Sequence, residues 1–162
     1  MKPARLIRQT LSRVFPTAAS RSRAYIQQGN AARDRQDWAV AATTFRAAVE
    51  LQPHLVPIWI QLGHALKEQG LIVPAIGAYR EAALRRPDLA EVHIFLAHLH
   101  KQLDQTDVAI AHFIRALHAG ESSTLQCDEL LRLLGRHSDM DRTTLAALLG
   151  DLFEQLPPGP VE

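Results

Sequence analysis

A set of residue types recurs in this chain at a fixed period of 34 residues, and this period constrains the fold more than any other feature. The central copy reads Trp59, Leu62, Gly63, Leu66, Ala75, Tyr79, Ala82 and Pro87. The positions 34 residues upstream hold Tyr25, Gln28, Gly29, Ala32, Ala41, Phe45, Ala48 and Pro53, and those downstream hold His93, Leu96, Ala97, His100, Ala109, Phe113 and Ala116. Residues 34 apart are called equivalent below. A repeat of this length indicates a stack of small units, each of which buries its apolar side on its neighbours.

Each repeat is predicted to be a helical hairpin made of a helix A and a helix B. The two helical patterns of the central copy meet at Gly70, and a Gly just after the last periodic residue typically ends a helix. Pro53 and Pro87 are expected to end helix B, because proline lacks the N–H that a continuing helix needs. We expect helix A at about 22–35, 56–69 and 90–103, and helix B at about 38–51, 72–85 and 106–119.

Small residues mark the places where the two helices of a repeat are expected to approach each other. Gly29, Gly63 and Ala97 lie on helix A, and Ala41, Ala75 and Ala109 lie on helix B. Close approach of two helix backbones requires small side chains at the crossing. The large residues, which are Tyr25, Trp59, His93, Phe45, Tyr79 and Phe113, would then fill the remaining space.

These residues and their period resemble the tetratricopeptide repeat family. The resemblance covers residues 22–123, as repeats 22–55, 56–89 and 90–123, and implies an all-α fold: a right-handed α-solenoid, or superhelix, of antiparallel helix pairs. Residues 124–156 are expected to form a degenerate fourth repeat that caps the stack, in which only Leu130 and Leu134 keep the expected residue type. The tail 157–162 is Pro-rich and is not expected to be helical.

The resemblance places helix A on the inner, concave surface, where we predict a peptide-binding groove. The equivalent positions form three rows: Gln27, Gln61 and Phe95; Asn30, His64 and His98; Arg33, Lys67 and Lys101. The cationic row suits an acidic peptide or a terminal carboxylate, and plain solvation of exposed charges is the alternative. Protonation of the two histidines below about pH 6.5 would strengthen that attraction.

The family also has a carboxylate clamp for the C-termini of chaperones, and this sequence does not carry it. The five clamp positions fall on Ile26, Asn30, Gln61, Glu91 and Phe95, and only Asn30 has the required residue type. An adaptor for chaperone tails is therefore not expected.

No motif for catalysis, a cofactor or a metal is present in the sequence. The chain has no G-x-S-x-G, Walker loop, G-x-G-x-x-G or H-E-x-x-H motif. At helical spacing His98 points away from His93 and His100, which occupy core positions where a buried, hydrogen-bonded histidine is the simple explanation. Cys127 lies in an apolar helical pattern and is interpreted as structural. We expect no enzyme activity, no cofactor and no bound metal.

Charge is distributed unevenly along the chain. Residues 1–23 carry a charge of +6 and the remainder −5, within a net charge of +1. A nucleic-acid-binding solenoid would carry its basic residues along the repeats, so nucleic acid is not an expected partner. No stretch is apolar for long enough to span a membrane.

Residues 1–21 are predicted to form a basic amphipathic helix followed by a link. Between Pro3 and Phe15 the apolar residues Leu6, Ile7, Leu11, Val14 and Phe15 fall on one side of a helical wheel, and the basic residues on the other. We expect this segment to cap the first repeat, and docking to a membrane surface or a partner is the alternative. We expect a cytoplasmic location, with peripheral attachment at the inner membrane surface as its variant.

The function expected from these observations is that of a non-catalytic scaffold that binds another protein through the groove. Two alternatives remain: the repeat region of a larger bacterial enzyme such as a glycosyltransferase, and a peripheral membrane assembly scaffold. The sequence does not indicate the partner or the oligomeric state.

Overall fold

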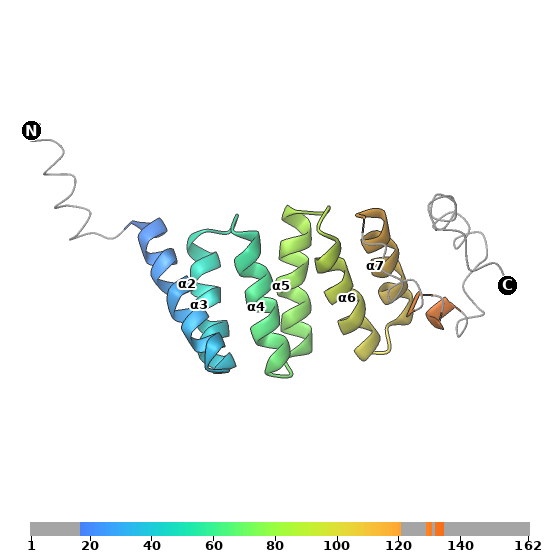
Figure 1. The fold of residues 1–162 in the computed structure, drawn as a ribbon, viewed down its shortest axis with the longest axis horizontal. Coiled ribbons are helices and arrows are strands. Elements are labelled where there is room, and N and C mark those ends of the chain that lie inside the picture. Colours follow the sequence, from blue (N-terminus) through green and yellow to red (C-terminus); the bar gives the residue numbers. More distant parts are fainter. Residues whose placement is uncertain (1–16, 121–128, 131, 135–162) are drawn as a thin grey trace, which may run out of the picture. The chain divides into compact units, whose positions relative to one another are not determined.

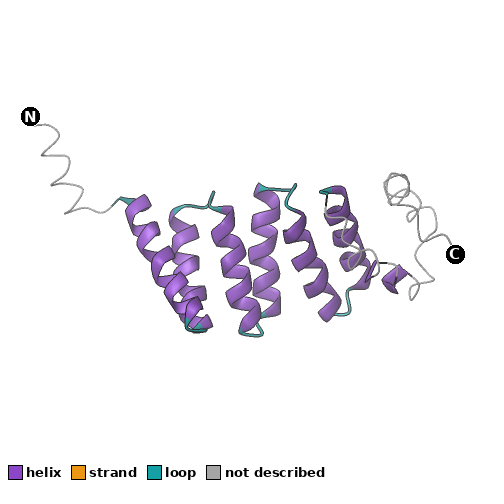
Figure 2. Cartoon of the chain, viewed as in Figure 1, coloured by secondary structure: helices purple, strands orange, loops and turns teal. Residues whose placement is uncertain are grey.

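The computed structural model describes residues 17–120, 129–130 and 132–134, and every regular element in this part is an α-helix (Figure 2). The helices are α2 (Ala18–Asp34), α3 (Trp38–Leu51), α4 (Val56–Glu68), α5 (Ile72–Arg85), α6 (Ala90–Gln102) and α7 (Thr106–His118). Consecutive helices pack as antiparallel hairpins, α2 with α3, α4 with α5, and α6 with α7 (Figure 1). The chain divides into two compact units, Met1–Arg85 (unit one) and Arg86–Glu162 (unit two).

The helix bounds confirm the predicted hairpins to within one residue, except at the start of the first helix. We expected that helix to begin near Ser22, but it begins at Ala18. The side chain of Thr17 accepts a hydrogen bond from the N–H of Ser20 at 3.2 Å, and the Ser20 hydroxyl donates to the Thr17 carbonyl at 2.9 Å. A side chain in this place satisfies an N–H that a helix start leaves without a partner. Ser22 lies instead in the core and donates to the carbonyl of Ala48 at 3.2 Å.

Each hairpin turns at an equivalent residue with a positive φ. The φ angles are 60° at Gln36, 75° at Gly70 and 56° at Asp104. In the second repeat the N–H of Gly70 donates to Lys67 and the N–H of Leu71 donates to Leu66, which closes the end of helix A. The predicted stop at Gly70 is confirmed. The same turn at Gln36 and Asp104 holds side chains in a backbone conformation that glycine adopts more easily.

The core of each hairpin contains a large aromatic ring from helix B that packs against a small residue of helix A. Phe45, Tyr79 and Phe113 are fully buried. A Cβ atom added to Gly63 would lie 2.5 Å from the Tyr79 ring, and one added to Gly29 would lie 2.6 Å from the Phe45 ring. These distances confirm that glycine is needed for the predicted close approach. The small helix-B residues are also fully buried, namely Ala41, Ala75 and Ala109.

The aromatic position near the start of helix A is held by a hydrogen bond to the preceding turn. The Trp59 Nε1–H donates to the carbonyl of Pro53 at 2.9 Å, and the equivalent His93 Nε2 lies 3.0 Å from the carbonyl of Pro87. The guanidinium of Arg85 also lies over the Trp59 ring, 5.2 Å from its centroid. An imidazole can replace the indole here because both rings present an N–H to the same kind of acceptor.

In unit two the described residues after α7 add to its core. Leu130, which the repeat pattern predicts as apolar, is buried, and so is Leu133, which the pattern did not single out; Leu134 packs against the same cluster. The predicted segments 3–15 and 157–162, most of the predicted cap 124–156 and Cys127 lie outside the described residues. The right-handed superhelix and the limits of the three repeats stay predictions.

Candidate functional site

All nine predicted peptide-binding residues are at least partly exposed, and they lie on the A helices. We call these nine residues the helix-A face. Unit one carries six of them, Gln27, Asn30 and Arg33 on α2 with Gln61, His64 and Lys67 on α4. Unit two carries Phe95, His98 and Lys101 on α6. Because the structure describes the two units separately, the rows are followed within each unit.

Arg33 connects the two A helices of unit one. Its Nη1 donates to Oε1 of Gln61 at 3.0 Å, which joins α2 to α4. Its Nε and Nη2 also donate to Oδ1 of the neighbouring Asp34, at 3.1 and 2.9 Å. The guanidinium is therefore held at a fixed place between the two helices by a neutral amide and a carboxylate.

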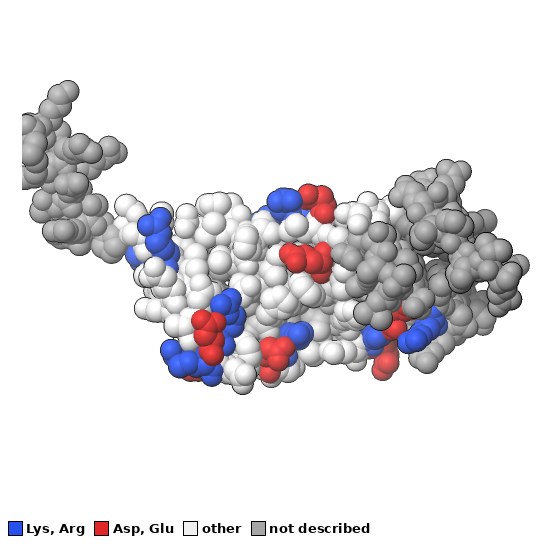
Figure 3. Space-filling model, viewed as in Figure 1, with Lys and Arg blue, Asp and Glu red and all other residues white. Residues whose placement is uncertain are grey.

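In the structure each cation of the predicted row forms an ion pair with a carboxylate, and for Arg33 this is Asp34. Lys67 forms an ion pair with Glu68 at 2.9 Å, and in unit two Lys101 forms one with Glu129 at 2.6 Å. The hydrogen bond from Lys101 is the main reason why the pKa of Glu129 lies below its usual value. On the viewed face in Figure 3, acidic and basic side chains lie next to one another. A ligand carboxylate would have to replace an acidic neighbour.

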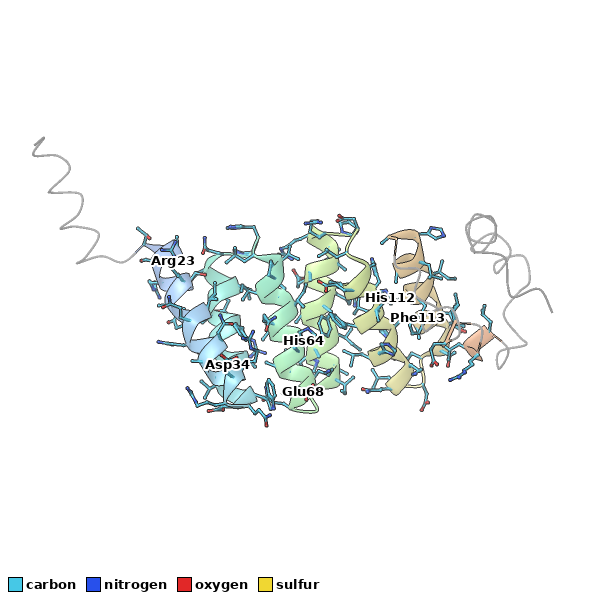
Figure 4. All side chains as sticks on the ribbon, viewed as in Figure 1. Arg23, Asp34, His64, Glu68, His112 and Phe113 are labelled. Carbon is cyan, nitrogen blue, oxygen red and sulfur yellow. The ribbon has the colours of Figure 1, made fainter. Side chains whose placement is uncertain are left out.

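His64 is anchored to the core by Tyr79. The Tyr79 hydroxyl and His64 Nδ1 are 2.9 Å apart, and the two rings meet edge to face at 5.6 Å. Burial, with the nearby charge of Lys67, lowers the pKa of His64 below 6.5, and burial raises the pKa of the Tyr79 hydroxyl. His64, labelled on α4 in Figure 4, therefore gains its charge at a lower pH than the sequence-based expectation. The equivalent His98 is exposed and packs edge to face on Phe113 at 5.3 Å.

The other histidines of α6 lie as expected. His93 is buried and His100 is half-buried, and both stack on His112 of α7, whereas His98 points elsewhere. Sequence reasoning missed His112. Its position in an apolar helix-B pattern was the available signal. Among the described residues no group of three His, Cys, Asp or Glu side chains could hold a metal ion. In the same part of the chain, no helix has both the length and the apolar character required to cross a membrane.

No family model and no curated relative matches the sequence. Solved structures do match. The Arabidopsis OM64 TPR domain is 20% identical with a TM-score of 0.62, over 69% of this chain and 93% of that chain. The first TPR of Spaghetti (RPAP3), bound to the HSP90 peptide SRMEEVD, is 11% identical with a TM-score of 0.65, over 74% of this chain and 94% of that chain. The MamA protein is 19% identical with a TM-score of 0.68, over 73% of this chain and 64% of that chain.

The chain has the tetratricopeptide-repeat fold. At identities this low, the likeness establishes the fold and does not establish what is bound. In this fold the helical pairs α2/α3, α4/α5 and α6/α7 correspond to consecutive repeats. The chain spans about two thirds of the length of the matched MamA chain.

Proposed function

We propose that the chain is a non-catalytic protein-interaction scaffold whose helix-A face binds an acidic peptide segment. The observation that carries the proposal is a pair of partly exposed cations, Arg33 on α2 and Lys67 on α4. The hydrogen bond from Arg33 to Gln61 joins these two helices. Two structures of the same fold are described as complexes with a peptide or chaperone partner, the RPAP3 domain with an HSP90 peptide and the yeast Sti1 TPR2B domain with pHsp70.

The acidic neighbours of these cations can give way to a ligand carboxylate. The Arg33–Asp34 side chains are 39% and 65% exposed, and those of Lys67–Glu68 are 40% and 43% exposed. Ion pairs this exposed contribute only about 0–1 kcal/mol each. A peptide that covers the surface would also remove water from its own salt bridge, which strengthens that bridge relative to the exposed pair it replaces.

Neutral polar side chains on the same face suit the main chain of an extended peptide. Gln27, Asn30 and Gln61 each offer an amide that can both donate and accept, and all three are exposed or half-exposed. Only Asn30 matches the clamp that this fold uses for chaperone C-termini. The proposed ligand is therefore an acidic segment that differs from those tails.

A peptide array tests this proposal. Acidic peptides and matched peptides in which Asp and Glu are replaced by Asn and Gln would be compared for binding to the whole chain, by fluorescence anisotropy at low and high salt. The triple variant Arg33→Ala, Lys67→Ala, Lys101→Ala should lose at least about tenfold in affinity for the acidic set, mostly at low salt. Its circular dichroism spectrum should stay unchanged.

A matched control removes the same charge elsewhere. Arg46, Arg80 and Arg115 are exposed residues of the B helices, and the triple change of these to Ala should leave binding nearly unchanged. Equal loss in both triple variants would mean that only net charge matters, and equal affinity of the acidic and neutral peptides would refute the acidic ligand.

A second function is attachment to an anionic membrane through residues 3–15. The observation that favours it is a set of exposed, small or polar residues on one side of α2. There Ala24, Gln28 and Ala31 are exposed, whereas the equivalents of the last two in α4, Leu62 and Ala65, are buried. The described exposed large apolar side chains all lie outside α2. An N-terminal cap would thus find little apolar surface to cover on this side, so we propose that the apolar side of the segment 3–15 binds lipid instead.

Vesicle sedimentation separates the two roles of this segment. Wild-type chain should sediment with anionic vesicles at low salt and not with neutral ones, and Leu11→Glu should abolish sedimentation without changing the unfolding midpoint. Sedimentation with neither vesicle type, together with a lower midpoint on deletion of residues 1–16, would instead establish the cap.

A further inference from the structure

One exposed side of α5 carries the two most exposed large apolar side chains of the described residues. Val73, in the first turn of the helix, is 68% exposed, and Leu84, in its last turn, is 74% exposed. Gly77 and Arg80 lie between them and are also exposed. At 100° per residue the four positions fall within about 60° of one another, so they form one line along the helix. We call Val73, Gly77, Arg80 and Leu84 the α5 stripe.

The repeat itself does not require the α5 stripe. The equivalent positions hold Ala39, Thr43, Arg46 and Glu50 in α3, and Asp107, Ala111, Ile114 and His118 in α7. Both ends of the line are therefore small or polar in the other two repeats. Glu50 stays exposed although α3 packs on α4, so in unit one the next helix does not cover this side of a helix B. The large apolar ends are specific to α5.

Gly77 is not needed for the packing of its own chain. A Cβ added there would meet nothing within 4 Å, whereas one added to Gly63 would lie 2.5 Å from the Tyr79 ring. The glycines of the described residues with a positive φ are Gly70 and Gly120, so the backbone at Gly77 does not need glycine either. A glycine within a helix costs about 1 kcal/mol relative to alanine. What it offers at an exposed position is close approach of a group from outside the chain.

The spacing of the α5 stripe is that of a seam between two helices. Its steps of four, three and four residues are the alternation of the two apolar positions of a heptad. Against a second copy that runs in the opposite direction, Val73 faces Leu84 of the second copy, and Gly77 faces Arg80. Each contact occurs twice, because a two-fold axis passes through the centre of such a seam. The α5 stripe is therefore complementary to itself.

The charges of this surface also suit a second copy. No ion pair of the described residues includes Arg80. Its aliphatic stem would lie over Gly77 of the second copy, and its guanidinium would reach Glu81, one turn further along that helix. Arg85 donates to Oε2 of Glu81, so Oε1 can accept the new bond. The two-fold axis gives two such ion pairs.

We propose that the chain forms a symmetric dimer in which the α5 stripes of two copies pack in antiparallel orientation. The seam is about 16 Å long. One helix pair of this length buries less surface than the roughly 1,200 Å² at which stable interfaces begin. The dimer is therefore weak, and the dilute chain is monomeric.

A dimer of this kind would carry two helix-A faces. The α5 stripe lies on a helix B, and none of the nine residues of the helix-A face belongs to α5. Two faces on one particle raise the apparent affinity for a partner that has two acidic segments. That consequence rests on the proposed function, but the dimer itself can be tested without a partner.

Sedimentation equilibrium of the full chain measures the association. Wild type should shift from monomer to dimer between about 10 µM and about 1 mM. The double variant Val73→Ala, Leu84→Glu gives α5 the residues of α3 at these positions, Ala39 and Glu50, and should weaken the dimer at least about tenfold. Val40→Glu is the matched control, because it replaces an exposed apolar side chain by the same acid on α3. It should leave the association unchanged, and all three chains should have the same circular dichroism spectrum.

Disulfide cross-linking tests the orientation of the two helices. Val73→Cys and Leu84→Cys are made as separate variants, each with Cys127→Ser. A disulfide needs Cα atoms within about 7 Å. In the antiparallel seam residue 73 faces residue 84, and identical positions are about 16 Å apart. Under mild oxidation the mixture of the two variants should therefore form a cross-linked dimer, and each variant alone should form little.

Three outcomes would overturn the proposal. The first is a chain that stays monomeric at every concentration, which would leave the α5 stripe to another protein or to lipid. The second is equal association of wild type and the double variant, in which case Leu11→Glu would show whether residues 3–15 make the contact. The third is cross-linking of each single variant as efficient as that of the mixture, which would mean that the helices do not pair in the antiparallel register.

Discussion

Replacing Gly63 by Ala should destabilise the chain, although the same replacement inside a helix normally stabilises it. Gly63 lies within α4, and its new Cβ would be 2.5 Å from Cε1 and 2.7 Å from Cδ1 and Cζ of Tyr79. The Tyr79 ring is fully buried, and its hydroxyl is held 2.9 Å from His64 Nδ1. The ring therefore cannot move aside without losing that hydrogen bond or disturbing its packing.

Two opposing terms determine the magnitude. Overpacking of a buried site costs about 1–3 kcal/mol, and replacing Gly by Ala within a helix gains about 1 kcal/mol. Since the clash is with a ring on a buried, hydrogen-bonded side chain, we expect a cost in the upper part of its range, about 2–3 kcal/mol, so that the free energy of unfolding falls by about 1–2 kcal/mol. Gly63→Leu should cost more.

Gly77 provides the matched control. It lies in α5, is exposed, and a Cβ added there would meet nothing within 4 Å. Gly77→Ala should therefore raise the free energy of unfolding by about 0.5–1 kcal/mol. Urea denaturation followed by circular dichroism gives both values. If Gly63→Ala stabilised the chain as much as Gly77→Ala does, the proposed contact of Tyr79 with the α4 backbone would be wrong.

Three further predictions concern the turn, the core and the titration of His64. Gln36→Gly should raise the free energy of unfolding by about 0.5–1 kcal/mol, because φ at this turn is positive, and Gly70→Ala should lower it similarly; urea midpoints measure both. Ala75→Glu should cost about 2–4 kcal/mol, since it buries a charge at a tight helix crossing, and an unchanged thermal midpoint would contradict the repeat register. Because the pKa of His64 is lowered, unfolded chains bind more protons just below pH 6.5. As the pH is lowered from 6.5, the free energy of unfolding should therefore decrease until the pH reaches the pKa of His64 in the folded chain. An NMR titration of the His64 ring with a midpoint at or above 6.5 would contradict this.

The period of 34 residues was sufficient to predict the hairpins, because the residues that recur with this period are the ones that pack the two helices of each pair together. Gly63 and Tyr79 are equivalent to Gly29 and Phe45, and both pairs make the same close contact. Local signals were less reliable at the edge of the repeats. The cap formed by Thr17 and Ser20 was overlooked, because the first repeat has no preceding copy against which its start could be aligned.

The sequence predicted which residues of the candidate face are exposed, but it did not predict their ion pairs. Equivalent positions correctly gave nine residues with at least partial exposure, because exposure follows from the helical face. They could not give the pairing of Arg33 with Asp34 or of Lys67 with Glu68, because each acid lies one residue outside the row that was compared. The partner of Lys101 was further removed, since Glu129 lies beyond the third repeat.

Equivalent positions are most informative where two repeats have different residue types but make the same contact. His93 keeps the hydrogen bond of Trp59 to a proline carbonyl, so the helix start needs only a ring N–H at this position. What the imidazole adds is a second nitrogen, and in unit two that nitrogen faces His112, where the second repeat has Ala78. The two residue differences between the repeats depend on each other. With an alanine in place of His112, the second nitrogen of His93 would lose His112 as a partner. With a tryptophan in place of His93, His112 would lose the acceptor for its Nδ1–H. The fold requires neither of them, because Trp59 and Ala78 occupy the equivalent positions of the second repeat.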